Sequence, residues 1–277
     1  MNRAYVFVVW IAGVILAGMI IAALLGPTLT PYDATAQNLL SRLLPPGASG
    51  PDGSHWFGTD ALGRDILSLI IMGARPALFV SVAAAAIAAV VGVLAGMIAG
   101  FRGGRFGDLL LSLTNIQLAF PFFLLAVTIV GILRPSTSLV IAVIALGSWV
   151  PFARVTYADT QQLRELEFIE AVRVMRGSNI RILFRHILPN VLPNVVVLCT
   201  FAIGTAIVME SGLSFVGLGV PSETPTWGRM LSEGRDYMDS AWWLTVFPGA
   251  AILLLVLVIN VIGEQLRDYA DPRVHTQ

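Results

Sequence analysis

Long stretches without a charged residue constrain this chain of 277 residues more than any other feature. A helix needs about 20 apolar residues to cross the hydrocarbon core of a bilayer. Six stretches reach or nearly reach that length, and they cover residues 4–32, 76–101, 109–133, 135–153, 186–209 and 240–263. We therefore predict an all-α integral membrane protein whose six transmembrane helices lie near residues 6–26, 78–100, 110–132, 137–155, 193–213 and 242–262.

Composition excludes several functional classes. Hydrophobic residues make up 56% of the chain, charged residues 12%, and the formal net charge is zero, which argues against a nucleic-acid partner. All 17 basic residues are arginines, so the chain lacks the lysine of a phosphate-binding P-loop and cannot be a P-loop ATPase by itself. The single cysteine and the three histidines do not lie at metal-ligand spacings. We expect no catalytic residue, no bound cofactor and no metal site.

The distribution of arginine predicts the orientation in the membrane. With the N-terminus inside, eleven arginines lie on the cytoplasmic side and six on the outer side. Both termini are therefore expected in the cytoplasm. We divide the chain into an N-terminal transmembrane helix with an external segment (1–75), a transmembrane core (76–264) with an internal loop at about 157–192, and a cytoplasmic tail (265–277).

The internal loop carries two short amphipathic patterns. The first places apolar residues at helical spacing at Phe168, Ala171, Val172 and Met175, and the second does so at Ile180, Leu183, Phe184 and Ile187. Gly177 and the two residues after it are expected to break the first helix, and Pro189 and Pro193 to end the second and start the next span. The hairpin could lie on anionic lipid or dock a cytoplasmic protein. Its mixed charges, including Glu167, Glu170 and Arg173, favour docking.

Some features inside the spans allow two interpretations. The small residues Ala84, Ala88, Gly92, Gly96 and Gly100 form a stripe that suits either a subunit or moving interface, or packing within one subunit. Pro121 predicts a kink in the third span. The polar residues Asn115, Gln117 and Asn260 suit hydrogen bonds between helices better than contact with a substrate. Glu210 could line a path or gate, or accept a hydrogen bond between helices.

The internal loop resembles the EAA loop of ABC-importer permeases, in which Glu-Ala-Ala is followed by Gly and then by Ile-x-Leu-Pro. Glu170-Ala171, Gly177 and Ile187-Leu188-Pro189 carry this resemblance. The third position is Val172 rather than Ala. The glycine follows Glu170 by seven residues instead of six, and Arg176 holds the expected place. Either the turn is shifted by one residue, or Arg176 projects into the docking interface.

Further matches narrow the family to dipeptide, oligopeptide and nickel importer permeases. Phe57-Gly58-Thr59-Asp60 with Gly63-Arg64-Asp65 resembles their external signature before the second span. Glu210, then the run 213–219, then Pro225-Thr226-Trp227-Gly228 resembles their external segment after the fifth span. The resemblance covers about 55–273, and the long segment after the first span suits the "C" type of the two paired permeases.

The resemblance implies the type I ABC importer permease fold and one half of a translocation path for peptides in a prokaryotic inner membrane, with nickel or another small solute as the alternative cargo. It also implies a second homologous permease, two cytoplasmic ATPase subunits that bind ATP and Mg, and an external substrate-binding protein, besides membrane lipid. The residues expected to couple to the ATPase are Glu167, Phe168, Glu170, Ala171, Val172, Arg173, Arg176, Gly177, Ile187 and Pro189. Those expected at an external gate or binding-protein contact are Gly58, Asp60, Arg64, Asp65, Glu210, Phe215, Trp227 and Gly228.

Two alternatives for these features come from outside the family. A stand-alone secondary transporter would need several buried ionisable groups or a clear inverted repeat, and neither is evident. Trp227 alone could also be an interfacial membrane anchor instead of a contact.

Overall fold

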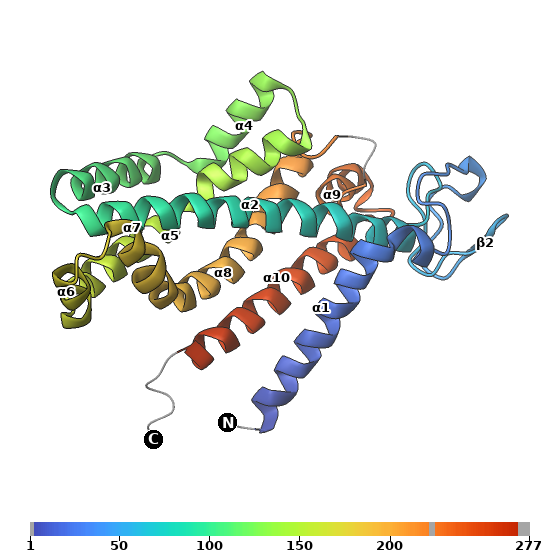
Figure 1. Ribbon diagram of the computed structural model, residues 1–277. Helices are drawn as coiled ribbons and strands as arrows, with labels where there is room; N and C mark the ends of the chain where they lie inside the picture. Colours follow the sequence, from blue (N-terminus) through green and yellow to red (C-terminus); the bar gives the residue numbers. More distant parts are fainter. Residues whose placement is uncertain (1–2, 222–224, 271–277) are drawn as a thin grey trace.

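The computed structural model describes residues 3–221 and 225–270, and most of this part of the chain is helical (Figure 1). Five of the described helices are long and apolar enough to cross a membrane. They are α1 (Arg3–Leu29), α2 (Ile66–Arg102), α5 (Thr137–Leu163), α8 (Leu188–Phe215) and α10 (Trp243–Ala270).

Shorter elements connect the long helices. They are η1 (Leu39–Ser41), α3 (Gly104–Ala119), α4 (Phe122–Leu133), α6 (Glu167–Val174), α7 (Asn179–Ile182), the π-helical turn η2 (Leu183–Ile187), α9 (Trp227–Gly234) and η3 (Arg235–Tyr237). The two-residue strands β1 (Ser49–Gly50) and β2 (Gly53–Ser54) pair antiparallel.

The predicted bend of the third span at Pro121 is confirmed in its position, but it is a break between two helices. Helices α3 and α4 meet at an angle of 82°, so the chain has six spans only if this bent pair counts as one. Proline disfavours the helical conformation at the residue before it, and Phe120 accordingly adopts an extended backbone with φ −99° and ψ 136°. Pro121 then begins α4 as its N-cap. The predicted span over 110–132 therefore consists of two helices instead of one.

Two predicted domain boundaries fall inside helices. Helix α2 begins at Ile66, ten residues before the expected boundary, because the Asp65 carboxylate accepts a hydrogen bond from the Ser68 amide over 2.8 Å and caps the helix. Its 37 residues span about 55 Å, more than the ~30 Å of a bilayer core. Helix α10 continues to Ala270, so residues 265–270 of the expected tail are helical, and residues 271–277 lie outside the described residues.

The prolines at 189 and 193 do not separate the hairpin from the fifth span. Residues 179–215 run as one continuous helix that contains the π-helical turn η2. In that turn the Leu188 amide donates to the Leu183 carbonyl, five residues earlier. This wider turn lets the helix pass Pro189, which has no amide proton to donate.

The packing of α2 on α5 forms the centre of the subunit. A Cβ atom added to Gly92 would lie 2.5 Å from the Trp149 carbonyl oxygen, and one added to Gly100 would lie 2.7 Å from that of Tyr157. The glycines thus allow backbone to approach backbone, as small residues do in membrane proteins. The stripe therefore serves packing within one subunit, which was the second of its two interpretations.

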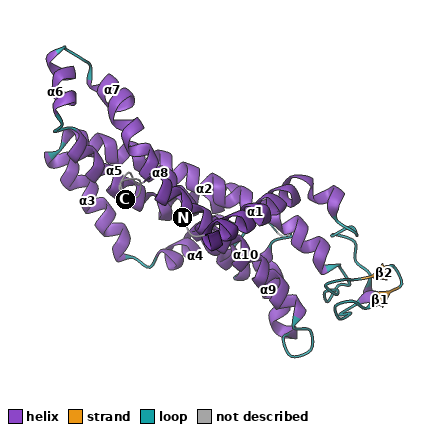
Figure 2. Ribbon diagram, turned by 90° about the horizontal axis from the view of Figure 1, so that it is seen from below, coloured by secondary structure: helices purple, strands orange, loops and turns teal. Residues whose placement is uncertain are grey.

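Two ends of the molecule carry the predicted functional segments. Helices α6 and α7 lie at the C-terminal end of α2, and the segment 30–65 with β1 and β2 lies beyond its N-terminal end (Figures 1 and 2). We call these the hairpin end and the loop end. One apolar core joins α2, α4, α5 and α8 to the hairpin, and a second joins α1, α2, α9 and α10 towards the loop end.

Candidate functional site

The hairpin at residues 167–187 follows α5 after a three-residue connection. Glu167 and Glu170 lie in the first turn of α6, and Arg173 lies in its last turn, so the charges complement the helix dipole. Ser178 caps α7, because its hydroxyl oxygen accepts a hydrogen bond from the Arg181 amide. The sequence predicted a helix break at this place, at Gly177 and the two residues after it.

Three isoleucines anchor the hairpin to the subunit. Ile169, Ile182 and Ile187 are fully buried and belong to the central core. The sequence missed Ile169 and Ile182, because each lies beside the apolar stripe that helical spacing selected. Ile187, which was expected to couple to the ATPase, cannot reach a partner from this position, and its side chain holds the hairpin in place instead.

The stripe that the sequence selected faces away from the subunit. Phe168 and Ala171 are exposed and Val172 is half-buried. At the tip, Val174 is 79% exposed and Met175 74%. We call the exposed apolar side chains of the hairpin the hairpin patch, which consists of Phe168, Val174, Met175, Ile180 and Phe184. Because five large apolar side chains are exposed within 17 residues, this patch is a candidate contact for another protein.

Exposed charges surround the hairpin patch. They are Glu167, Glu170, Arg173, Arg176, Arg181 and Arg185. The Arg173 guanidinium lies 5.3 Å from the centre of the Phe101 ring, which holds it against the end of α2. Within the described residues Glu170 makes no ion pair, so its carboxylate is available to a partner.

The turn between α6 and α7 shows whether the displaced glycine shifts the turn by one residue. The Gly177 amide donates to the Val172 carbonyl over 2.9 Å, and the Arg176 amide donates to the Arg173 carbonyl over 2.9 Å. This pair of bonds is a Schellman motif, whose left-handed residue is usually glycine. Here Arg176 holds that position with φ +56°, so the turn is not shifted. Gly177 packs against Val172, where an added Cβ would lie 2.6 Å from a methyl carbon.

At the loop end, Asp60 organises the turn that precedes α2. Its carboxylate accepts hydrogen bonds from the amides of Leu62 and Arg64, each over 2.8 Å. The Arg64 side chain pairs with Asp60 and also reaches Glu233 on α9, 2.8 Å away. Arg64 and Glu233 therefore join the motif before α2 to helix α9, which begins at Trp227 of the second motif.

A buried triad fixes the first turn of α2. The two carboxylate oxygens of Asp65 contact Nδ1 of His55 over 3.0 Å and the amide and hydroxyl of Ser68 over 2.8 Å each. His55 and Asp65 are almost completely buried. Asp65 thus builds the loop end from inside and does not present a contact surface.

Most residues expected at a gate or contact are also internal. Trp227 is 2% exposed, and its indole Nε1 donates to the Ile70 carbonyl over 2.9 Å, so it is neither an interfacial anchor nor a surface contact. Gly58, Asp60 and Gly228 are buried in the same region. Glu210 is buried in α8 and accepts a hydrogen bond from Ser214. Only Arg64 and Phe215, which is 38% exposed, retain access to a partner.

Three polar residues in the spans were expected to make hydrogen bonds between helices, and two of them do so. Asn115 on α3 accepts a hydrogen bond from Arg154 on α5. The Gln117 side chain donates to the Leu146 carbonyl and accepts from the Trp149 indole, and both partners lie on α5. No such bond is present for Asn260 among the described residues. Within those residues, no group of three His, Cys, Asp or Glu side chains is placed to hold a metal ion.

Comparison with known proteins identifies two matching family models. Residues 92–276 match the model described as binding-protein-dependent transport system inner membrane component. Residues 8–46 match the N-terminal TM domain of oligopeptide transport permease C.

Curated relatives match over nearly the whole chain. The chain is 42% identical to the dipeptide transport system permease protein DppC of Alkalihalophilus pseudofirmus over 94% of its own length and 84% of the relative's. It is 38% identical to the di/tripeptide transport system permease protein DppC of Pseudomonas aeruginosa, covering 92% and 85% of the two chains. It is 40% identical to the glutathione transport system permease protein GsiD of Escherichia coli, covering 92% and 83%.

The fold also matches a solved structure. A chain of the MetNI methionine ABC transporter in an inward-facing conformation aligns with a TM-score of 0.58 at 20% identity, over 74% of this chain and 98% of the other. At this identity the likeness concerns the fold alone, and it agrees with the expected permease architecture.

Proposed function

Because this chain belongs to the family of inner membrane components of binding-protein-dependent transport systems, we propose that it forms half of a peptide path and couples to ATPase subunits through the hairpin. The family consists of multi-pass membrane components and not of enzymes.

The main support for the proposal is that one face of the hairpin is buried against the subunit and the other face is exposed. Its buried isoleucines continue into the central core, while the hairpin patch and Glu170 face outwards. A force applied to the exposed side would therefore be transmitted to α2, α5 and α8. Residues 179–215 form one helix, so the second arm of the hairpin cannot move without the fifth span.

The energy required is consistent with a packed contact and not with one ion pair. Switching a two-state equilibrium from 99:1 to 1:99 takes about 5.5 kcal/mol of differential binding. An exposed salt bridge contributes about 0–1 kcal/mol. Burying one large apolar side chain contributes about 1.5–3 kcal/mol, so two to four members of the hairpin patch would suffice.

The partners and the orientation follow from the family and from the arginine distribution. We propose that two ATPase subunits bind the hairpin end, which then faces the cytoplasm together with both termini. A second permease completes the path, and an external binding protein delivers cargo at the loop end. The cargo is proposed to be a di- or oligopeptide, because relatives named for dipeptide, di/tripeptide and glutathione transport match nearly the whole chain.

The coupling role can be tested by reversing one charge in the assembled complex. We propose that the Glu170 carboxylate pairs with a basic group of the ATPase. Glu170→Arg should therefore lower the ATP hydrolysis that loaded binding protein stimulates at least about tenfold, because the new arginine and that basic group repel each other. Glu264→Arg, an exposed residue on α10 outside the hairpin, serves as the matched control. Full stimulation and normal uptake with Glu170→Arg would reject the coupling role.

The cargo can be tested by uptake into vesicles that contain the complete complex. Radiolabelled dipeptide, tripeptide and nickel should be compared at equal concentration, with and without the binding protein. Saturable peptide uptake that depends on ATP supports the proposal. Nickel uptake without any peptide uptake would assign the complex to the alternative cargo.

A further inference from the structure

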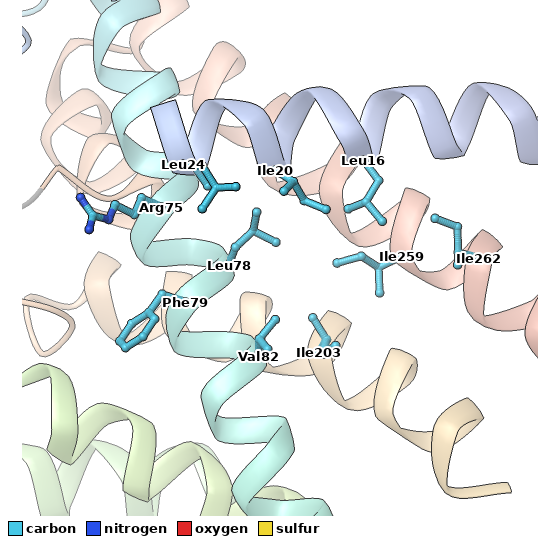
Figure 3. Close-up of a pocket in the computed structure, with 11 residues that line it drawn as sticks. Leu16, Ile20, Leu24, Arg75, Leu78, Phe79, Val82, Ile203, Ile259 and Ile262 are labelled. Atoms are coloured by element: carbon cyan, nitrogen blue, oxygen red, sulfur yellow. The ribbon is translucent and has the colours of Figure 1, made fainter. Parts of the chain in front are cut away.

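An apolar cavity of about 510 Å³ lies between α1 and the core, and its lining includes no residue of the hairpin. It is lined by α1, α2, α8 and α10 (Figure 3). All of its lining side chains are apolar except that of Arg75. The volume falls within the ~300–1,000 Å³ of small-molecule sites. Because the lining is apolar with one cation, a suitable occupant has a long apolar part and one anionic group.

The cavity opens sideways towards the membrane. Leu24 on α1 is 73% exposed, and Phe79 and Val82 on α2 are also exposed. An apolar ligand can therefore enter from the bilayer without crossing a polar surface. The cavity lining on α1 extends from Leu16 to Leu24, which corresponds to about 12 Å of helix. This length approaches the ~15 Å of one leaflet of hydrocarbon.

Arg75 lies at one end of this row of side chains. In Figure 3 its guanidinium points away from Leu16 and Ile262, towards the end of α1 that joins the loop end. Among the described residues no carboxylate pairs with it. An unpaired cation in a span is costly unless it reaches an anion or water at the interface. A phosphate at the level of the lipid headgroups would meet this need.

We propose that the cavity binds one phospholipid of the leaflet at the loop end, with an acyl chain between α1 and the core and its phosphate on Arg75. A phosphate accepts two parallel hydrogen bonds from a guanidinium, which makes arginine the suitable residue. The acyl chain fills space that α1 leaves open against α8 and α10. The lipid thereby holds α1 to the subunit.

Native mass spectrometry of the detergent-purified complex tests the headgroup contact. Phosphatidylglycerol is added to delipidated complex, with phosphatidylcholine in a parallel series. Arg75→Gln should weaken phosphatidylglycerol binding about fivefold, the effect of one basic residue at an anionic surface. Arg134→Gln, an exposed arginine at the end of α4 outside the cavity, should leave binding unchanged. Equal affinity of Arg75→Gln and the unaltered complex would overturn the proposal.

A second pair of variants tests the acyl chain. Ile20→Trp places an indole in the cavity and should reduce the binding of both lipids, whereas Ile21→Trp, on an adjacent exposed face outside the lining, should not. A photoreactive side chain at Phe79 identifies the occupant in the membrane-embedded complex. Capture of phospholipid supports the proposal, and capture of a helix of the paired permease in its place overturns it.

Discussion

The indole Nε1 of Trp227 donates a hydrogen bond to the carbonyl of Ile70, 157 residues earlier in the chain, and thereby joins α9 to the first turns of α2. The ring lies over Gly73, where an added Cβ would come within 2.6 Å of it. A glycine on α2 and a tryptophan on α9 are thus complementary in shape. The pair explains why a tryptophan in an external motif serves the interior of the subunit.

Trp227→Phe should lower the free energy of unfolding by about 1 kcal/mol through the lost hydrogen bond, in addition to a packing loss from the smaller ring. Gly73→Ala should destabilise the same contact by overpacking, at about 1–3 kcal/mol. Thermal unfolding of the purified complex in detergent measures both. Trp56→Phe is the control, because Trp56 is exposed at the loop end. An unchanged unfolding temperature for Trp227→Phe would contradict the assigned contact.

Arg176→Gly should stabilise the turn of the hairpin. A residue with a Cβ in the left-handed region costs about 1–2 kcal/mol, and glycine avoids this cost. Hydrogen exchange at the Gly177 amide should slow, because that amide closes the Schellman motif on Val172. Gly177→Ala should have the opposite effect, since its methyl group would collide with Val172. Faster exchange in Arg176→Gly would show that the arginine side chain stabilises the turn by another contact.

The ion pair of Arg64 and Glu233 should couple the segment before α2 to α9 only weakly. Glu233 is about half exposed and also pairs with Arg229, so a double-mutant cycle with Arg64→Gln and Glu233→Gln should give about 0–1 kcal/mol. The coupling should decrease further at 1 M salt, where the Debye length is about 3 Å. A coupling of several kcal/mol that resists salt would mean that a partner or another element excludes water from this pair.

Pro121→Ala should reduce the bend between α3 and α4. The substitution restores an amide donor and permits the helical conformation at Phe120. Spin labels at Leu109 and Ile132, both exposed, should move apart relative to the unaltered protein when Cys199 is replaced by alanine in both samples. Unchanged distances would show that contacts with α5, and not the proline, set the angle of 82°.

Val174→Ser should separate the contact role of the hairpin from its anchoring. The side chain is exposed, so the unfolding temperature of the subunit should not change, while ATP hydrolysis stimulated by loaded binding protein should fall. Ile169→Ala is the complementary variant. Its side chain is fully buried, and the truncation should cost about 2–5 kcal/mol of stability. A Val174→Ser complex with full stimulation would remove the hairpin tip from the proposed contact.

The amino-acid sequence alone was sufficient to predict the apolar spans, the amphipathic hairpin and the family resemblance. Helical spacing and the absence of charge are local properties, so they identify long helices such as α2 and α10 without any tertiary information. The same reasoning identified the role of the polar groups at Asn115 and Gln117, because buried polar side chains in a membrane need partners. Helix ends were less well predicted, since caps such as Asp65 can extend a helix beyond its apolar stretch.

Tertiary structure alone decided which face of each motif is buried. Spacing selected the stripe that contains Phe168, whereas the core received the neighbouring Ile169, because burial depends on which surface of α6 meets α2 and α8. It also showed that Trp227 is internal, and that Arg176 adopts the left-handed conformation usually left to glycine. Periodicity can be read along the chain itself. Whether a helix face packs in the core, against lipid or against a partner depends on elements that are distant in sequence.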